Sequence, residues 1–230
     1  RVALGRALLA RPRLLLLDEP LASLDAARKS EILTLLERIK RETPVPIFHV
    51  THSLAEALRL ADQLVLIEAG RVVAQGRATD LLGRGDTPGL AQRPDAGSLL
   101  LTRVAAHDPE GRWSDVLLGA QRLRIGPVPA GVGETVRCYV LANDVMLATV
   151  RPQAISVRNI LATTVRRLVT RDVSAVHVEL DADGTRLLAT VTPAAVAELG
   201  LAPGAAVFAL VKSVSVDAPA GLRMLETDHV

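Results

Sequence analysis

Helical and extended patterns of apolar residues alternate along the first part of the chain. Apolar residues at helical spacing predict a helix over residues 1–10, which Pro12 prevents from continuing. The four leucines of "LLLLDEP" then predict a buried strand over residues 14–18. Asp25 can accept a hydrogen bond from the first turn of a helix, so we expect a helix over residues 26–42.

The same alternation continues as far as residue 82. The pattern predicts, in order, a strand over residues 46–52, a helix over 53–60, a strand over 63–69, a hairpin through Gly70 into "RVVAQG", and a short helix over 78–82. Apolar strands separated by helices are typical of a parallel sheet whose two faces are covered. We therefore expect residues 1–82 to form an α/β parallel-sheet domain.

The pattern changes after residue 82. Glycine, proline and charged residues without periodicity predict a linker over residues 83–98. Beyond it, the pattern predicts strands over 99–106, 113–125, 135–150, 160–169, 174–180, 185–192 and 206–216, and one helix over 193–199. Many short strands are typical of small barrels. We expect an all-β, OB-like part, divided near residues 151–156 into a β-rich region (99–155) and a second domain (156–218), with a tail (219–230).

Composition narrows the class of protein. Hydrophobic residues make up 49% of the chain, but no apolar run is long enough for a membrane helix, so any membrane link has to run through a partner. A net charge of +2 and only 2% aromatic residues argue against nucleic acid as a partner. The single cysteine, Cys138, excludes an internal disulfide and fits a reducing cytoplasm. We expect Cys138 to be a small buried residue, and Trp113 and Tyr139 to lie in the core or an interface.

The first residues suggest a truncated chain. The sequence starts at Arg1, inside the predicted first helix, without a methionine or a signal-like segment. We therefore expect it to be the carboxyl-terminal part of a longer protein.

Two adjacent carboxylates follow the leucine run. In a parallel sheet the carboxyl ends of the strands line the functional crevice, so Asp18 and Glu19 are expected at that edge. One carboxylate can hold the water shell of Mg²⁺ on a nucleotide phosphate, while its neighbour orients and polarises an attacking water. Acids in such places also simply end strands or cap helices, and the pair alone does not decide between these roles.

The wider context resembles the second half of the nucleotide-binding domain of ABC transporters, which are P-loop NTPases. "LLLLDEP" is followed by "SLD", then by "HVTHS", then by the hairpin "IEAGRVVAQG". The resemblance implies that Glu19 and His52 are catalytic, that Asp18, Ser23 and Asp25 bind nucleotide, and that Asp18 holds Mg²⁺ through water. The phosphate loop, G-x-x-x-x-G-K-[ST], is not found in these residues, so we expect this fragment to be inactive alone.

A lysine interrupts the apolar face predicted for residues 207–216. If this segment is one strand, Lys212 shares a face with Phe208, Leu210, Val214 and Val216. A buried, unpaired ammonium group is costly, so Lys212 has to reach solvent, an acidic partner or a bound anion. A lysine can equally well cover apolar surface with its aliphatic stem while its ammonium group reaches water.

"SVRN" and "KSVS", with the segment between them, resemble a TOBE domain of the Mop type over residues 156–217. The resemblance implies an oxyanion site formed by Ser156, Arg158, Asn159, Lys212 and Ser213. Such a site suits molybdate, which offers only hydrogen-bond acceptors. Val157 departs from the alanine frequent in the family, and Arg158 could instead brace the fold. In the family these sites form between β domains of neighbouring subunits.

Together the two resemblances imply the ATP-hydrolysing subunit of an ABC importer for molybdate. The expected cofactors are ATP and Mg²⁺, with molybdate as ligand. Expected partners are a second ATPase subunit in a homodimer, membrane-spanning permease subunits and, indirectly, a periplasmic or extracellular binding protein. The expected location is the cytoplasmic face of the plasma membrane. Alternatives are an importer ATPase for tungstate, sulfate, sugar, polyamine or iron, or a non-catalytic molybdate-binding module.

Overall fold

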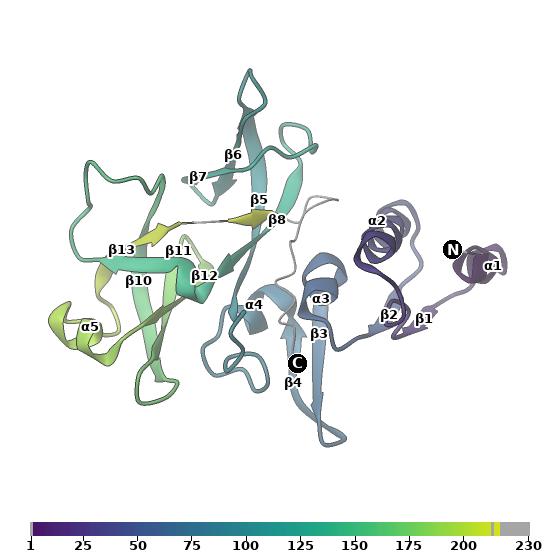
Figure 1. The fold of residues 1–230 in the computed structure, drawn as a ribbon, viewed down its shortest axis with the longest axis horizontal. Coiled ribbons are helices and arrows are strands. Elements are labelled where there is room, and N and C mark those ends of the chain that lie inside the picture. Colours follow the sequence, from purple (N-terminus) through teal and green to yellow (C-terminus); the bar gives the residue numbers. More distant parts are fainter. Residues whose placement is uncertain (1, 213, 217–230) are drawn as a thin grey trace. The chain divides into compact units, whose positions relative to one another are not determined.

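The elements predicted for residues 1–61 are present in the first of the two units into which the chain divides. The computed structural model describes residues 2–212 and 214–216, and the second unit begins at Asp62 (Figure 1). The elements of the first unit are α1 (Val2–Leu9), β1 (Leu15–Asp18), α2 (Ala26–Glu42), β2 (Ile47–Val50) and α3 (Leu54–Leu60). Asp25 caps α2, because its side chain accepts a hydrogen bond from the Arg28 N–H at 3.0 Å, as predicted.

β1 and β2 form a two-stranded parallel sheet, which agrees with the parallel pairing expected from the sequence. One face of this sheet packs against apolar residues of the helices, including Leu33 and Leu36 of α2. The other face is open within the described residues: Leu16 is 68% exposed and Phe48, its partner in the register, is 56% exposed. The sequence predicted a strand buried on both faces, and no described element of the first unit covers the second face.

The second unit contains a hairpin, a short helix and two five-stranded sheets. Its elements are β3 (Gln63–Glu68), β4 (Arg71–Arg77), α4 (Ala78–Leu82), β5 (Gly97–His107), β6 (Ser114–Leu118), β7 (Gln121–Ile125), β8 (Thr135–Leu141), the 3-10 turn η1 (Ala142–Asp144), β9 (Val145–Ala148), β10 (Asn159–Thr170), β11 (Val176–Ala182), β12 (Thr185–Val191), α5 (Pro193–Glu198), β13 (Ala206–Val211) and β14 (Ser215–Val216). These positions confirm the strands and helices predicted after residue 62, with three exceptions. The strand predicted over residues 113–125 is two strands, β6 and β7, joined by a turn at residues 119–120, and the other two exceptions are described below.

The two sheets are built in the same way. We call β5–β9 the first β half and β10–β14 the second β half. Each begins with a long strand that carries an irregularity, at Val104/Ala106 in β5 and at Val165/Arg167 in β10. The strand orders are β14-β8-β5-β6-β7 and β12-β11-β10-β13-β9, and one apolar cluster is shared by residues of both halves. This part of the chain therefore consists of two copies of one β unit.

Each half gives its last strand to the sheet of the other half. β9 pairs with β13, and β14 pairs with β8. The sequence predicted single strands over residues 135–150 and 206–216. Both predictions are wrong, and they fail at the corresponding position in each half. The chain leaves one sheet and enters the other between Leu141 and Val145 and again between Val211 and Ser215, so each predicted strand is broken in two.

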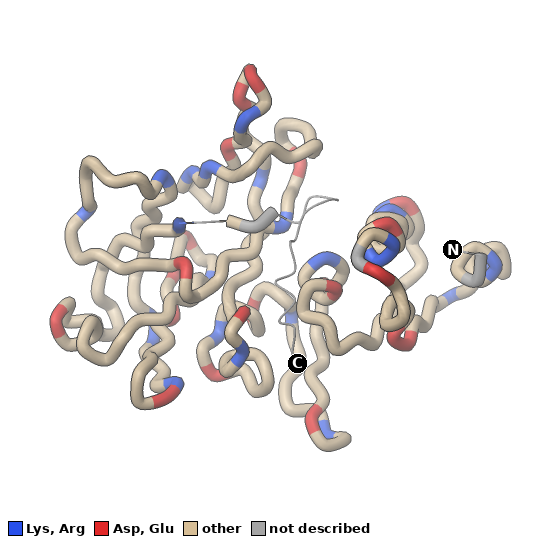
Figure 2. Tube along the Cα trace, in the orientation of Figure 1, with Lys and Arg blue, Asp and Glu red and all other residues tan. Residues whose placement is uncertain are grey.

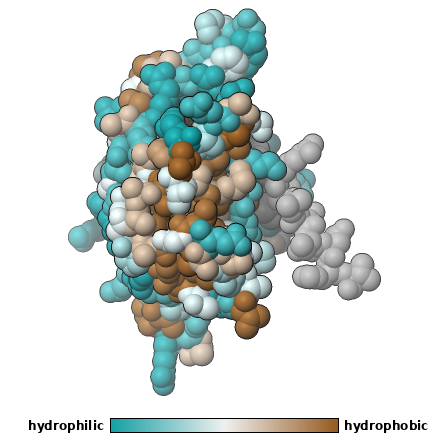
Figure 3. Space-filling view, turned by 90° about the vertical axis from the view of Figure 1, so that its left-hand side faces the viewer, coloured by the Kyte–Doolittle hydropathy of each residue, from teal (hydrophilic) through white to brown (hydrophobic). Residues whose placement is uncertain are grey.

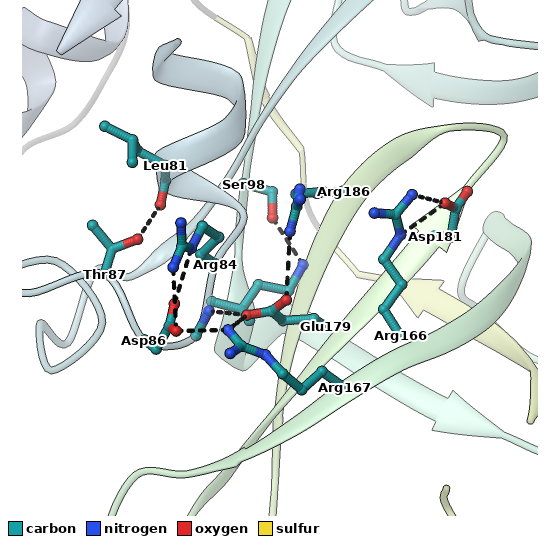
Figure 4. A network of polar contacts seen from close by, with 12 residues as sticks. Leu81, Arg84, Asp86, Thr87, Ser98, Arg166, Arg167, Glu179, Asp181 and Arg186 are labelled. Carbon is teal, nitrogen blue, oxygen red and sulfur yellow. Dashed lines mark hydrogen bonds and ion pairs between the residues drawn. The ribbon is translucent and has the colours of Figure 1, made fainter. Parts of the chain in front are cut away.

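The segment predicted as a linker has neither helix nor strand between Gly83 and Ala96, but it is packed rather than free. Thr87 and Ala91 are almost fully buried. The Gly85 N–H donates to the buried Glu179 carboxylate at 2.9 Å, and Asp86 pairs with Arg167 at 2.9 Å (Figure 4). Asp86 also pairs with Arg84, and Glu179 also pairs with Arg186. This polar network fixes the segment to the second β half.

Candidate functional site

The carboxyl edge of the β1–β2 sheet brings together the residues predicted for the nucleotide site. Because the strands are parallel, Asp18 at the end of β1 stands beside Val50 at the end of β2. The next residue, Glu19, donates its N–H to the Val50 carbonyl at 3.0 Å and has a φ of +41°. This left-handed turn takes Glu19 out of the strand direction at a conformational cost of about 1 kcal/mol or more.

Glu19 and His52 are within hydrogen-bonding reach of each other. His52 Nδ1 lies 3.3 Å from Glu19 Oε1. Both side chains are solvent-accessible, with exposed fractions of 48% for Glu19 and 76% for His52. A carboxylate and an imidazole placed together at an open edge can jointly hold a water molecule or exchange a proton with it.

Asp18 has the properties of a ligand for the water shell of a hard cation. Its side chain is exposed at the end of β1, and within the described residues its carboxylate has no recorded ion pair or hydrogen bond. Oxygen ligands of this kind suit Mg²⁺, which keeps several of its waters when it binds protein. No group of three His, Cys, Asp or Glu side chains in the described part of the chain forms a complete metal site. A magnesium ion here would therefore need further ligands, such as nucleotide phosphates.

Ser23 and Asp25 follow on the loop between β1 and α2. Ser23 is exposed. The Asp25 carboxylate is already engaged, because it accepts from the Arg28 N–H and pairs with the Arg28 guanidinium at 3.3 Å. Its recorded contacts are those of a helix cap at the mouth of the site.

A buried polar group beneath His52 was missed by the sequence analysis. The Glu56 carboxylate is hydrogen-bonded to His49 Nε2 at 3.0 Å and to the Thr51 hydroxyl at 2.7 Å. Burial raises the pKa of Glu56, but the hydrogen bonds from His49 and Thr51 outweigh it and hold the pKa below its usual value. The signal in the sequence was the alternation of β2, which places His49 on the covered face of the sheet.

The residues predicted for the oxyanion site lie around the start of β10. Ser156 and Arg158 are exposed on the segment that leads into the strand. Asn159 is buried, and its side chain is used within the protein: Oδ1 accepts from the Arg124 N–H at 2.7 Å, and Nδ2 donates to the Arg124 carbonyl at 3.0 Å. The amide thus holds β7 against β10.

Lys212 does not lie within a strand, although the sequence predicted one there. β13 ends at Val211, and Lys212 lies in the bend that follows, with its side chain exposed. Val207, Ala209 and Val211 belong to the apolar core. Phe208 and Leu210, expected to share a face with Lys212, are on the side of β13 opposite to these core residues, and the strand ends before the predicted face can continue to Val214 and Val216. Ser213 and the tail 219–230 lie outside the described residues.

The predictions that Cys138 is buried and that Tyr139 is a core residue are confirmed, whereas the core-or-interface position of Trp113 stays a prediction. Cys138 is fully buried, and burial raises the pKa of its thiol to about 11. Tyr139 is a core residue whose hydroxyl donates to the Asp95 carbonyl at 2.7 Å. Trp113 is partly buried, and the guanidinium groups of Arg112 and Arg124 lie 4.5 and 4.7 Å from its ring centroid.

No helix among the described residues is both long and apolar enough to cross a membrane. The face of the second unit that Figure 3 turns to the viewer has an apolar band bordered by polar residues. Apolar bands bordered by polar residues are frequent on surfaces that bind other proteins.

Comparison with known proteins finds similar sequences over most of the chain. Residues 155–218 match the TOBE domain. The chain is 43% identical to the molybdenum import ATP-binding protein ModC of Rhizobium etli over 94% of its own length and 61% of that protein. It is 43% identical to ModC of Rhodospirillum rubrum and 46% identical to ModC of Brucella abortus, over 94% of its length in each case and 60% and 59% of theirs.

The chain spans about three fifths of the length of the curated relatives that it matches. Among solved structures, the cytoplasmic molybdate-binding protein ModG with molybdate bound is 32% identical, with a TM-score of 0.48, and the match covers 53% of this chain and 96% of ModG.

Proposed function

We propose that this chain, a homologue of the molybdenum import ATP-binding proteins, is part of the ATP-hydrolysing subunit of an ABC importer for molybdate. The observation that carries the proposal is the 3.3 Å approach of Glu19 and His52 at the carboxyl edge of a parallel sheet, beside Asp18. Residues 1–82 would then be the carboxyl-terminal part of a P-loop ATPase domain of the ABC type.

In this proposal each residue at the edge has a separate task in ATP hydrolysis. Glu19 orients and polarises the attacking water, and His52 hydrogen-bonds to that water or to the terminal phosphate. Asp18 holds Mg²⁺ through water; when bound, Mg²⁺ would offset the negative charge of the phosphates. Ser23 and Asp25 shape the loop at the entrance of the site.

The proposed partners follow from the names of the relatives. An import ATPase needs membrane-spanning permease subunits to move its cargo, and these would receive it from a periplasmic or extracellular binding protein. We place the chain at the cytoplasmic face of the plasma membrane, as one member of a homodimer. The apolar band on the second unit supports a protein partner on that face.

The proposed role of the second unit is to sense the oxyanion. Exposed Ser156, Arg158 and Lys212 surround the start of β10, where hydrogen-bond donors and positive charge suit molybdate. Ser213 stays in this proposal as a further donor. Asn159 contributes to the site by holding β7 against β10, because its amide is bonded to the main chain of Arg124.

The test of the ATPase proposal uses the full-length protein that contains this chain. Glu19→Gln should lower the rate of phosphate release by about 100-fold or more, since it removes the group that activates water, and should leave ATP binding intact. Glu42→Gln, which changes an exposed carboxylate at the end of α2, is the control and should retain the wild-type rate. Undiminished hydrolysis by Glu19→Gln would remove Glu19 from its assigned role.

A further inference from the structure

Three chain segments that carry cationic residues are joined at the start of β10. Asn159 pairs with Val211, so Arg158 and Lys212 stand opposite each other one position beyond the last pair of the β10–β13 ladder. Adjacent segments in such a ladder are about 5 Å apart. The third cation, Arg124 of β7, is joined to the same point because its main-chain N–H and C=O are both bonded to the Asn159 side chain.

The side chains of these cations face outward. Asn159 and Val211 are 6% and 1% exposed, whereas Arg158 and Lys212, their neighbours in sequence, are both exposed. This alternation is the ordinary result of extended backbone, in which successive side chains point to opposite sides. Arg124 is also exposed and alternates with buried Leu123 and Ile125. Figure 2 shows several Lys and Arg positions near β7 and the start of β10.

Arg124 can bind a further anion without losing its present partner. Its Nε and Nη2 donate to the Asp115 carboxylate at 3.0 and 3.3 Å, and among the described residues no bond is recorded for its Nη1. Asp115 also accepts from Arg122 at 3.2 Å, so one carboxylate faces two guanidinium groups. The positive charge of Arg124 is therefore only partly compensated.

We propose that Arg124 is a third cationic ligand of the oxyanion site, so that the site takes donors from both β halves. The proposal rests on the oxyanion-sensing part of the proposed function. The first β half supplies Arg124, and the second supplies Arg158 and Lys212. The ligand class is a tetrahedral oxyanion with two negative charges.

Three cations from separate segments suit such an ion for a geometric reason. A tetrahedral dianion presents acceptor oxygens in several directions, and donors on one strand can reach only some of them. Two or three positive charges also favour a dianion over a monoanion of similar size, because the attraction scales with the charge of the ion. The attraction at an exposed site is screened by salt, so binding should weaken as ionic strength rises.

Trp113 supplies a built-in reporter of this site. It is the only tryptophan in the chain, and the Arg124 guanidinium lies 4.7 Å from its ring centroid. An anion held by Arg124 changes the charge next to the indole ring, and the ring is attracted to cations through its negative face. Indole emission should therefore change when the site fills.

The experiment is calorimetric titration of the 230-residue chain with sodium molybdate and with sodium sulfate, at low salt and at protein concentrations that allow dimers to form. Arg124→Ala should weaken oxyanion binding about tenfold, as expected for the loss of one charged donor at an exposed site. Arg124→Lys, which keeps the charge, should lose less. Arg122→Ala is the matched control, because Arg122 lies on the same strand and pairs with the same Asp115.

The outcomes separate the two proposals. The inference is supported if the oxyanion affinity falls in Lys212→Ala and in Arg124→Ala but not in Arg122→Ala. In that case the change in Trp113 emission should also disappear in Arg124→Ala. Binding that weakens in Lys212→Ala but is unchanged in a folded Arg124→Ala overturns the inference and leaves the proposed oxyanion site in place. If the wild-type chain binds neither anion, both fail, while the ATPase assay still decides the nucleotide site. Circular dichroism and melting of each variant identify loss of folding.

Discussion

At the scale of single residues, the Glu56 carboxylate is the group that holds the loop carrying His52. Glu56 is 6% exposed, and its hydrogen bonds to His49 and Thr51 tie the end of β2 to α3. The Thr51 hydroxyl also accepts from the Ser53 N–H at 3.0 Å. The residues on both sides of His52 are thereby fixed, which supports a precise position for an imidazole that is itself exposed.

Glu56→Gln should destabilise the protein by about 1–3 kcal/mol at neutral pH, because charge-assisted hydrogen bonds are replaced by weaker ones in a buried place. The pKa of Glu56 is lowered in the folded protein, so its contribution is present above its unfolded pKa near 4.5 and is lost as the pH falls through the folded pKa. Urea unfolding of both proteins at pH 7 and at pH 3.5 measures the difference, which should shrink at the lower pH. Equal stability of wild type and variant at pH 7, with Glu42→Gln as reference, would contradict this role.

At the scale of elements, the packed segment between α4 and β5 depends on close approaches that only glycine permits. A Cβ on Gly85 would lie 2.7 Å from the His177 Cβ, and a Cβ on Gly83 would lie 2.7 Å from the Arg186 Cβ. These positions let the segment lie against β11 and β12, where His177 Nε2 is 2.8 Å from the Ala91 carbonyl oxygen. Gly83 and Gly85 thus permit close packing and do not form a hinge.

Gly85→Ala should cost roughly 1–3 kcal/mol of stability, since the added methyl group has to displace buried neighbours. Gly126→Ala is the matched control, because no atom lies within 4 Å of the position of its Cβ. Thermal melting of the two variants tests the difference. A Gly85→Ala melting curve that coincides with that of Gly126→Ala would show that the segment is looser than described.

Local patterns predicted the elements well and the pairing between them poorly. The α2 helix from Ala26 to Glu42 was predicted to the residue, because a capping aspartate and a long apolar stripe both mark it. The bend at Lys212 was missed, because an apolar run continues past it and only the exchange between sheets explains the break. The Asn159–Arg124 bonds join residues that lie 35 positions apart in the sequence, and sequence spacing has no signal for such a contact. The Glu56 cluster was missed because His49 belongs to an ordinary strand alternation.

At the scale of the whole molecule, the two β halves repeat each other down to single hydrogen bonds. Gly133 donates to the Val104 carbonyl at 2.8 Å, and Gly204 donates to the Val165 carbonyl at 2.8 Å. Both glycines have a φ of +88°. The repeat extends to the joint between the halves, where the Ser98 hydroxyl accepts from the Leu188 N–H just as Asn159 accepts from the Arg124 N–H.

An isolated fragment of residues 155–218 should not behave as a folded monomer. It lacks β9, which pairs with β13, so an unpaired edge would be exposed where Val145–Ala148 normally lie. We expect self-association or loss of structure, measured by light scattering and circular dichroism. A fragment of residues 62–218, which keeps both halves, should unfold cooperatively. A monomeric, cooperatively unfolding 155–218 fragment would be evidence against the exchanged strand.

The exchange of β9 and β14 restricts how this region can recombine in evolution. A recombination event with its breakpoint between the repeats would separate each copy from a strand that completes the other. Duplication, loss or transfer of one copy is therefore penalised at the level of folding. Grafting onto another protein can succeed only when residues 97–216 move as a single cassette.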